Sequence, residues 1–207
     1  MAKTEIKAWL VDLDGTLYAN KPVRLAMACE LVLFGLPAIR VIRRFRSEHE
    51  AMRREENSGK KEDTLPPMPY DLQLDRTASR LEMPREQVSN LVETWMHRRP
   101  GKWLWLFRHR RLLKEIADFR ENGGKTAIVS DYPASAKLLA LRAADLFDVV
   151  VANGEAGGPT RLKPSPEGYL LAAKRLGILP QNCLVIGDRD DADGLAAKAA
   201  KMAFRKV

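Results

Sequence analysis

Short apolar runs alternate with stretches of helical spacing along most of the chain. The runs that predict buried strands are residues 6–11, 126–129, 149–151 and 183–186, with a short last strand at 203–204. The helical spacing in the second half covers residues 112–121, 134–146, 165–176 and 194–201. Because strands and helices alternate, we expect an α/β fold with a doubly wound, Rossmann-like parallel sheet covered on both faces.

About 80 mostly helical residues separate the first expected strand from the others. Their spacing predicts a helix at 22–54, interrupted near Gly35-Leu36-Pro37, and further helices at 70–81 and 86–97. Residues 57–69 are polar and then Pro-rich, which predicts a loop, and residues 98–102 predict a linker. The simplest division is a core of residues 1–18 and 103–207 that carries a helical insertion of residues 19–102.

Composition narrows the class of protein. With 207 residues, 45% of them hydrophobic and 30% charged, collagen-like, low-complexity and fully disordered chains are excluded. The two cysteines, Cys29 and Cys183, have neither metal-ligand spacing nor a disulfide framework, so we expect a reducing compartment. The apolar run near the start is too short for a signal-peptide core, and no apolar stretch is long enough to span a membrane. These features favour a cytoplasmic protein.

A net charge of +8 permits attraction to nucleic acid, acidic lipid or phosphorylated small molecules, without choosing among them. Aromatic and basic residues interleave over 95–111, which could bind single strands, but packing at a hinge is the preferred interpretation. We therefore expect no nucleic-acid partner. Residues 23–42 are mostly apolar and are followed by several arginines. The preferred interpretation is packing within the insertion, and the alternative is contact with a membrane surface. The sequence leaves the oligomeric state open.

Polar residues gather where the expected strands end, the edge at which such sheets bind ligands. They are Asp12 and Asp14, Ser130 and Asp131, and Asp188, with Lys163 in the loop before a core helix. Asp12 and Asp14 are two residues apart and point to the same side, so two carboxylates share one small space. A divalent cation would relieve their repulsion, and oxygen-only ligands favour Mg²⁺.

Lys163 and Ser130 supply the complementary chemistry. A lysine ammonium suits a phosphate oxygen, and a serine hydroxyl beside a helix start can donate to another. An anion site, a hard metal and a carboxylate nucleophile together suggest phosphoryl transfer through an aspartyl-phosphate.

Four segments occur in order along the chain: Asp12-Leu13-Asp14-Gly15-Thr16 after a strand, Ser130 ending a strand, Lys163 before Pro164, and Gly187-Asp188 followed by further aspartates up to Asp193. This series resembles the motifs of the haloacid dehalogenase superfamily of hydrolases. The first and fourth segments are the specific ones. The insertion after the first motif resembles the helical cap of the family's first subclass.

The resemblance implies a role for each motif residue. Asp12 would attack phosphorus, and Asp14 would protonate the leaving oxygen and then activate water. Ser130 and Lys163 would hold the phosphoryl group, with Asp131 beside it at the substrate. Mg²⁺ would be bound by the Asp12 carboxylate, the Asp14 backbone carbonyl and the Asp188 carboxylate. Asp193, or as second choice Asp191, would support the metal site or orient Lys163.

The leading hypothesis is a Mg²⁺-dependent phosphatase acting on a small phosphorylated metabolite. Relatives that dehalogenate typically lack the second aspartate of the first motif, so Asp14 favours phosphate chemistry. Asp131 departs from the family pattern, because many relatives carry Asn there and a further negative charge beside a phosphate is unfavourable unless it turns away. The alternatives are an intramolecular phosphomutase of the same superfamily and a non-catalytic protein whose basic insertion binds a membrane surface or nucleic acid.

Overall fold

The computed structural model describes residues 5–57 and 68–207. Its centre is a five-stranded sheet in the order β3-β2-β1-β4-β5, in which every neighbouring pair is parallel. The strands are β1 (Ala8–Val11), β2 (Lys125–Ser130), β3 (Val149–Ala152), β4 (Cys183–Gly187) and β5 (Ala203–Lys206). The expected α/β, Rossmann-like parallel sheet is confirmed. Because β2 and β3 extend the sheet on one side of β1 and β4 and β5 on the other, the strand order reverses at β1, where such sheets bind ligands.

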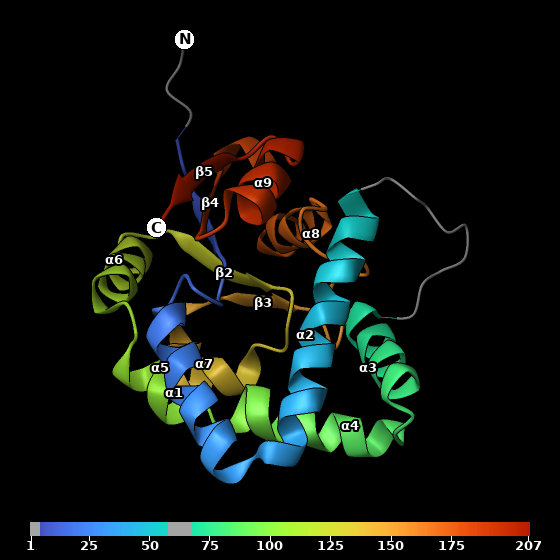
Figure 1. Cartoon of the computed structure of the whole chain (residues 1–207). Coiled ribbons are helices and arrows are strands. Elements are labelled where there is room, and N and C mark those ends of the chain that lie inside the picture. Colours follow the sequence, from blue (N-terminus) through green and yellow to red (C-terminus); the bar gives the residue numbers. More distant parts are fainter. Residues whose placement is uncertain (1–4, 58–67) are drawn as a thin grey trace.

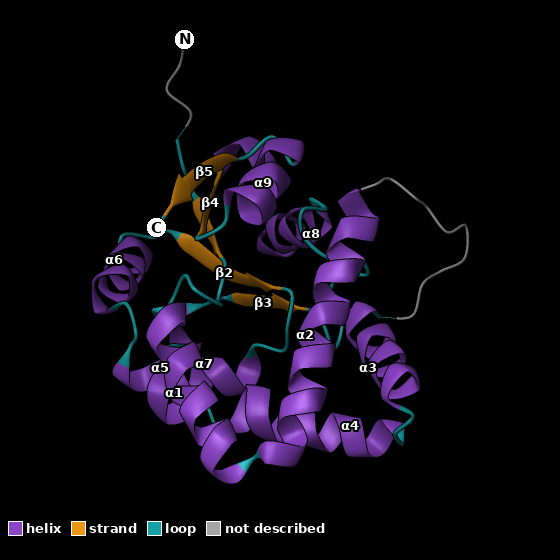
Figure 2. Ribbon diagram, viewed as in Figure 1, coloured by secondary structure: helices purple, strands orange, loops and turns teal. Residues whose placement is uncertain are grey.

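Helices cover both faces of the sheet (Figure 2). Alternate residues of β1 to β4 enter different apolar clusters; in β1, Leu10 packs on one face and Val11 on the other. The helices α8 (Glu167–Leu176) and α9 (Leu195–Ala199) cover the Leu10 face. The Val11 face is covered by α6 (Arg110–Glu121) and α7 (Ser135–Leu141).

The segment between β1 and α6 folds into helices that lie together in Figure 1, mostly below the sheet, with α2 rising beside it. They are α1 (Asn20–Phe34), α2 (Leu36–Asn57), α3 (Pro69–Leu81), α4 (Arg85–Val92), a π-helical segment Glu93–Arg98, and α5 (Gly101–Leu106). The expected break at Gly35 is confirmed. A Cβ on Gly35 would lie 2.3 Å from the Trp95 ring, so the close approach of that ring requires glycine.

Some expected elements differ from the structure. The predicted linker at 98–102 is mostly helical, because α5 begins at Gly101 and packs Leu104 into the core. The helix expected over 134–146 ends at Leu141, where Arg142 turns left-handed with φ of 54°. That turn lets Ala143 and Phe147 enter the core instead of continuing outward. Most of the loop expected at 57–69 lies outside the described residues.

Three short helical turns complete the described part of the chain: Ala144–Leu146 and Pro180–Asn182 are 3-10 helix, and Asp190–Gly194 is π-helix. No helix within residues 5–57 and 68–207 is both long and apolar enough to cross a membrane. The division into a core of 1–18 and 103–207 and an insertion of 19–102 stays a prediction.

Candidate active site

Asp12 is the first residue after β1, the central strand of the sheet. Its backbone N–H donates to the carbonyl of Ile186 at 2.8 Å, which continues the pairing of β1 with β4 by one residue. Its carboxylate accepts a hydrogen bond of 2.8 Å from the Thr16 hydroxyl. Gly15 has φ of +98°, and a Cβ there would lie 2.2 Å from Asp188 Oδ2. Glycine therefore lets the turn after β1 approach the carboxylate that follows β4.

Lys163 lies between two buried carboxylates. Its Nζ is 2.5 Å from Asp12 Oδ1 and 2.8 Å from Asp193 Oδ1, and the Tyr169 hydroxyl donates to the same Asp193 oxygen at 2.7 Å. Burial alone would lower the pKa of Lys163, but Asp12 and Asp193 raise it well above its usual value. Although burial opposes ionisation of Asp193, the ammonium group lowers the pKa of that carboxyl. Lys163 is therefore a fixed positive charge at the end of the central strand.

An acidic cluster suited to a cation stands beside this lysine. One carboxylate oxygen each from Asp12, Asp188 and Asp193 lies within 4.8 Å of the others. Burial raises the pKa of Asp12 to about 8, with Asp193 adding to the effect, and burial together with Asp193 also raises the pKa of Asp188. An all-oxygen donor set with excess negative charge fits Mg²⁺. The structure thus brings Asp12 and Asp188 together as expected and adds the Asp193 side chain to them.

The Asp14 side chain points away from that cluster. Both of its oxygens accept hydrogen bonds of 2.6 Å from Lys137 Nζ, and Oδ1 also accepts one of 2.5 Å from the Tyr18 hydroxyl. Burial works against ionisation, but Lys137 outweighs it and lowers the pKa of Asp14. Asp12 and Asp14 are therefore two carboxylates with different surroundings at one strand end, the first toward Lys163 and the second toward Lys137.

Ser130 ends β2, and residues 125–128 of β2 pair with β1, so Ser130 and Asp12 follow neighbouring strands at the same edge of the sheet. The side chain is buried, and its hydroxyl oxygen accepts a hydrogen bond of 3.2 Å from the backbone N–H of Tyr132. The residue lines the same cavity as Asp12 and Lys163. This placement leaves the hydroxyl proton available to an anion in the cavity.

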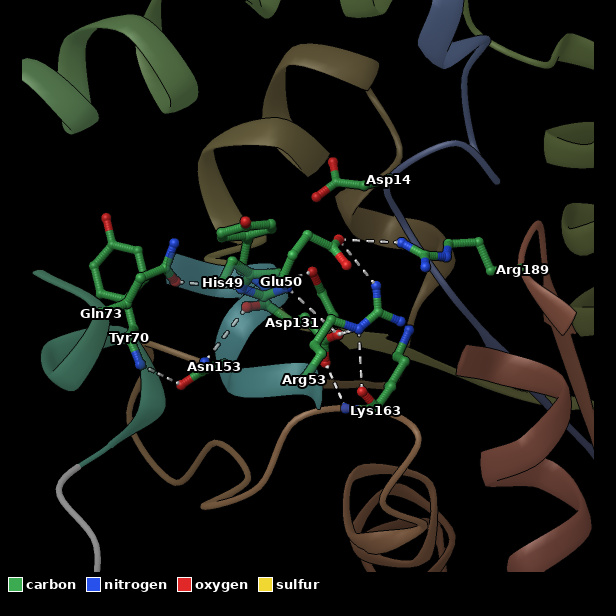
Figure 3. Close-up of polar contacts among 12 residues, drawn as sticks. Asp14, His49, Glu50, Arg53, Tyr70, Gln73, Asp131, Asn153, Lys163 and Arg189 are labelled. Carbon is green, nitrogen blue, oxygen red and sulfur yellow. Dashed lines mark hydrogen bonds and ion pairs between the residues drawn. The ribbon is translucent and has the colours of Figure 1, made fainter. Parts of the chain in front are cut away.

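Asp131 is engaged by its neighbours, as Figure 3 shows. Its Oδ1 accepts a hydrogen bond of 3.1 Å from the backbone N–H of Lys163. Its Oδ2 lies 3.9 Å from His49 Nε2 and 4.0 Å from Arg53 Nε, both on α2. The charge that departs from the family pattern is therefore held by the helical insertion and by the loop that carries Lys163, although Asp131 still lines the cavity.

The two aspartates considered for a supporting role lie in different places. Asp193 is buried in the cluster, and its Oδ2 accepts a hydrogen bond of 3.3 Å from the backbone N–H of Arg189. Asp191 is exposed and forms an ion pair of 2.6 Å with the Arg189 side chain. The π-helical turn Asp190–Gly194 rotates Asp193 inward and leaves Asp191 outside, a backbone distortion often found at functional sites.

A cavity of about 440 Å³ opens between the carboxyl edge of the sheet and the helical insertion. The motif residues form its floor, and α1 and α2 contribute Arg24, Arg46, His49 and Arg53 to its lining. Neither Arg24 nor Arg46 has an ion-pair partner within residues 5–57 and 68–207. The cavity thus presents free positive charge opposite the acidic cluster.

Arg53 connects the insertion to the loop of Lys163 (Figure 3). Its Nε donates to the Lys163 carbonyl at 3.2 Å, and its Nη1 lies 3.5 Å from Glu50 Oε1. The same Glu50 oxygen is 3.4 Å from Arg189 Nη1, which lies in the loop after β4. A chain of charged contacts therefore runs from α2 to two of the loops that build the floor of the cavity.

Several of these residues have no motif that would identify them. Lys137 is a single lysine in the first turn of an apolar helix, and Arg53 lies in a mixed charge run that reads as a solvated helix end. Tyr18 and Tyr169 are aromatic residues at ordinary packing positions. The one sequence feature that could have identified Lys137 is that it interrupts the apolar residues of α7, the helix that follows β2.

Comparisons with known proteins identify the family of the chain. A family model described as haloacid dehalogenase-like hydrolase matches residues 6–201. The chain belongs to this hydrolase family. A glyceraldehyde 3-phosphate phosphatase of Methanopyrus kandleri is 28% identical over 205 residues, covering 98% of this chain and 84% of that protein.

Solved structures share the fold at lower identity. A phosphatase of this family from Thermococcus onnurineus has a TM-score of 0.62 at 21% identity, covering 98% of this chain and 86% of that one. The L-2-haloacid dehalogenase of Xanthobacter autotrophicus gives 0.64 at 20%, with 98% and 77% covered. A β-phosphoglucomutase of Clostridium difficile gives 0.58 at 20%, with 96% and 83% covered. These neighbours have different named activities, so the fold alone does not select the reaction.

Proposed function

We propose that this hydrolase is a Mg²⁺-dependent phosphatase that acts on a small phosphorylated metabolite through an aspartyl-phosphate at Asp12. The observation that carries the proposal is the contact of 2.5 Å between Lys163 Nζ and Asp12, with Asp188 beside them and Asp14 on the same turn. A buried ammonium next to a carboxylate can neutralise a phosphoryl group while the carboxylate attacks it. The similarity to a phosphatase of Methanopyrus kandleri supports the same reaction class.

Asp14 would transfer the proton in each of the two half-reactions. In the first, an Asp12 oxygen bonds to phosphorus as the ester bond breaks, and Asp14 gives a proton to the leaving oxygen. In the second, Asp14 takes a proton from water while the water oxygen attacks phosphorus, which releases inorganic phosphate and the Asp12 carboxylate. Lys163 and the Ser130 hydroxyl hold the phosphoryl oxygens in both steps.

Mg²⁺ would be held by the carboxylates of Asp12 and Asp188, with the Asp14 backbone carbonyl as a further ligand, and it would neutralise phosphoryl charge. Asp193 would keep Lys163 oriented. The Lys137 contact favours the ionised form of Asp14, which takes the proton from water in the second half-reaction, and disfavours the protonated form that the first half-reaction requires.

The presence of Asp14 also supports phosphate over halide chemistry. A carbon–halogen bond needs no proton on its leaving group, whereas an ester oxygen leaves more readily when protonated. Asp14 accepts three hydrogen bonds from Tyr18 and Lys137, which hold its carboxylate at the cavity.

The test is phosphate release from an aryl phosphate and from a panel of phosphorylated metabolites, with and without Mg²⁺. We expect release that needs Mg²⁺ and that Asp12→Asn abolishes. Asp190→Asn is the matched control, because Asp190 is also an aspartate just beyond a strand end, here after β4, but it is exposed and pairs with Lys206. Retention of most activity in Asp12→Asn would remove Asp12 from the mechanism. An isomerised sugar phosphate, formed in place of free phosphate, would indicate a phosphomutase.

A further inference from the structure

The corner between α1 and α2 exposes an unusual number of large apolar side chains. The exposed fractions are 59% for Val32, 69% for Leu33, 71% for Phe34 and 65% for Leu36. Leu25, on α1, is exposed by 67%. The corner lies at the lower edge of the molecule in Figure 1, away from the sheet. A contiguous apolar surface of this kind usually marks an interaction site.

Packing within the insertion does not account for these side chains. The helix α1 buries Val23 and Met27, and α2 buries Val41 and Phe45, on their inner faces. The residues named above lie on the remaining faces and on the turn. Twelve large apolar side chains are exposed within the described residues; four of them belong to this one corner, and Leu25 lies further back on α1. Their clustering distinguishes them from apolar residues scattered singly over a surface.

The surface beside this apolar corner is positively charged. Residues 31–47 contain four arginines and no acidic residue. Arg40 and Arg43 are exposed, and neither has an ion-pair partner in the part of the chain that the structure describes. With Leu36 and Ile39 they line a shallow hollow of about 520 Å³. The hollow therefore places free guanidinium groups directly next to exposed aliphatic side chains.

The acidic residue that directly precedes this stretch in the sequence does not cancel its charge. Glu30 precedes the corner on α1, but its carboxylate accepts a hydrogen bond of 2.7 Å from Trp103 Nε1 and lies 2.8 Å from Lys102 Nζ. Burial opposes its ionisation, yet these contacts lower the pKa of Glu30. The carboxylate thus faces α5, on the inner side of the helix, and leaves the outer surface basic.

We propose that this corner docks on an anionic membrane surface, with Leu33, Phe34 and their neighbours inserted among the lipid chains and Arg40 and Arg43 on lipid phosphates. Apolar residues flanked by arginine are the combination that an anionic bilayer interface binds. Nucleic acid fits less well, because Phe34 is the one ring among the exposed apolar residues of this corner, and Val32, Leu33 and Leu36 offer none on which a base could stack. A second copy of this surface would bring arginines against arginines.

The test is co-sedimentation of the full chain with phosphatidylcholine vesicles, with and without phosphatidylglycerol. We expect binding only to the anionic vesicles, with a partition coefficient that falls as salt rises. The double variant Leu33→Ser/Phe34→Ser should lower that coefficient by about tenfold or more, since binding scales with inserted apolar area. The double variant Arg40→Gln/Arg43→Gln should also lower the partition coefficient for anionic vesicles.

The matched control is Leu139→Ser/Leu179→Ser, which removes two leucines that are 70% and 62% exposed elsewhere on the surface. It should bind as the unchanged protein does. Binding that is absent, insensitive to lipid charge, or equally reduced in the control would overturn the proposal. So would sedimentation analysis in which the unchanged protein is a dimer, Leu33→Ser/Phe34→Ser is a monomer, and neither binds vesicles. None of these measurements depends on phosphatase activity.

Discussion

Asp14 owes its position to a lysine outside all four motifs. Lys137 reaches both oxygens of Asp14 across 123 residues of sequence, and the contact lowers the pKa of the carboxyl. Tyr18 holds the same carboxylate from the other side. The proton transfers that we assign to Asp14 therefore depend on a side chain delivered by α7, the helix that follows β2.

Replacing that lysine should impair the reaction without unfolding the protein. In Lys137→Met the apolar stem is kept and the ammonium group is lost, so Asp14 loses its fixed orientation. We expect kcat to fall by about 10²-fold, the scale of a small misplacement of a reacting group. Steady-state kinetics on an aryl phosphate measures this. Lys114→Met is the control, because Lys114 is exposed and pairs only with Asp118, one helical turn away. Equal kcat in the two variants would contradict the assignment.

The motif residues could be predicted from sequence because one geometric rule places them. The carboxyl ends of β1, β2 and β4 meet at one edge, so Asp12, Ser130 and Asp188 must lie near each other once the strands are recognised. Lys137 and Arg53 could not be predicted in this way. They reach the site from helices, and the direction of one long side chain is set by tertiary packing that sequence spacing does not encode.

The helical insertion contains a histidine whose burial has a measurable consequence. His97 lies in the π-helical segment Glu93–Arg98, where the Tyr70 hydroxyl is 3.0 Å from its Nε2. Burial is the main reason that the pKa of His97 falls to about 3, with the charge of Lys137 as a further cause. The ring is therefore neutral in the folded protein and gains a proton on unfolding.

The sign of the pH dependence follows from that difference. Below a pH of about 6.5 the unfolded chain binds a proton at His97 that the folded chain does not, so stability falls as the pH decreases. Between about pH 7 and pH 5 this single group should cost about 2 kcal/mol of unfolding free energy. The variant His97→Gln should lose correspondingly less unfolding free energy between the same two pH values. Urea unfolding of both proteins at the two pH values measures the difference, and parallel losses would contradict a neutral buried ring.

Secondary structure followed the sequence where local signals are strong. The strands β1 to β4 are short apolar runs that end at or directly before a polar residue or glycine, and the break at Gly35 coincides with the Trp95 ring. The helix α5 was missed because Arg98 to Lys102, with a Pro-Gly pair, look like a linker. Tertiary packing favours the helix in this segment, because the helix places Leu104 in the apolar core.

Taken together, the core and the insertion enclose a charged cavity whose two sides differ in sign. The acidic cluster of Asp12, Asp188 and Asp193 lies on the core side, and Arg24 and Arg46 face it from the insertion. A phosphorylated substrate that reaches across the cavity would meet a cation site at one end and guanidinium groups at the other. This division of charge favours an anionic ligand in a site that also needs a metal.

Metal binding should therefore stabilise the folded protein. A cation that binds only the folded state raises the unfolding free energy by about 2.7 kcal/mol at a concentration of about 100 Kd. We expect Mg²⁺ to raise Tm in the unchanged protein and in Asp190→Asn. The increase should be lost in Asp188→Asn, which removes one of the clustered carboxylates. Thermal unfolding with and without Mg²⁺ measures this without reference to activity, and an equal Tm increase in Asp188→Asn would exclude the cluster as the metal site.

The central claim is that Asp12 forms a covalent bond to phosphorus. Borohydride reduces an aspartyl-phosphate to homoserine and leaves a free carboxylate unchanged, so the bond can be located by peptide mass spectrometry after quenching during turnover. We predict reduction at Asp12, only when Mg²⁺ and a phosphate ester are both present, and none at Asp14 or Asp188. Phosphate release that proceeds while Asp12 stays unreduced, or reduction at another carboxylate, would contradict the account.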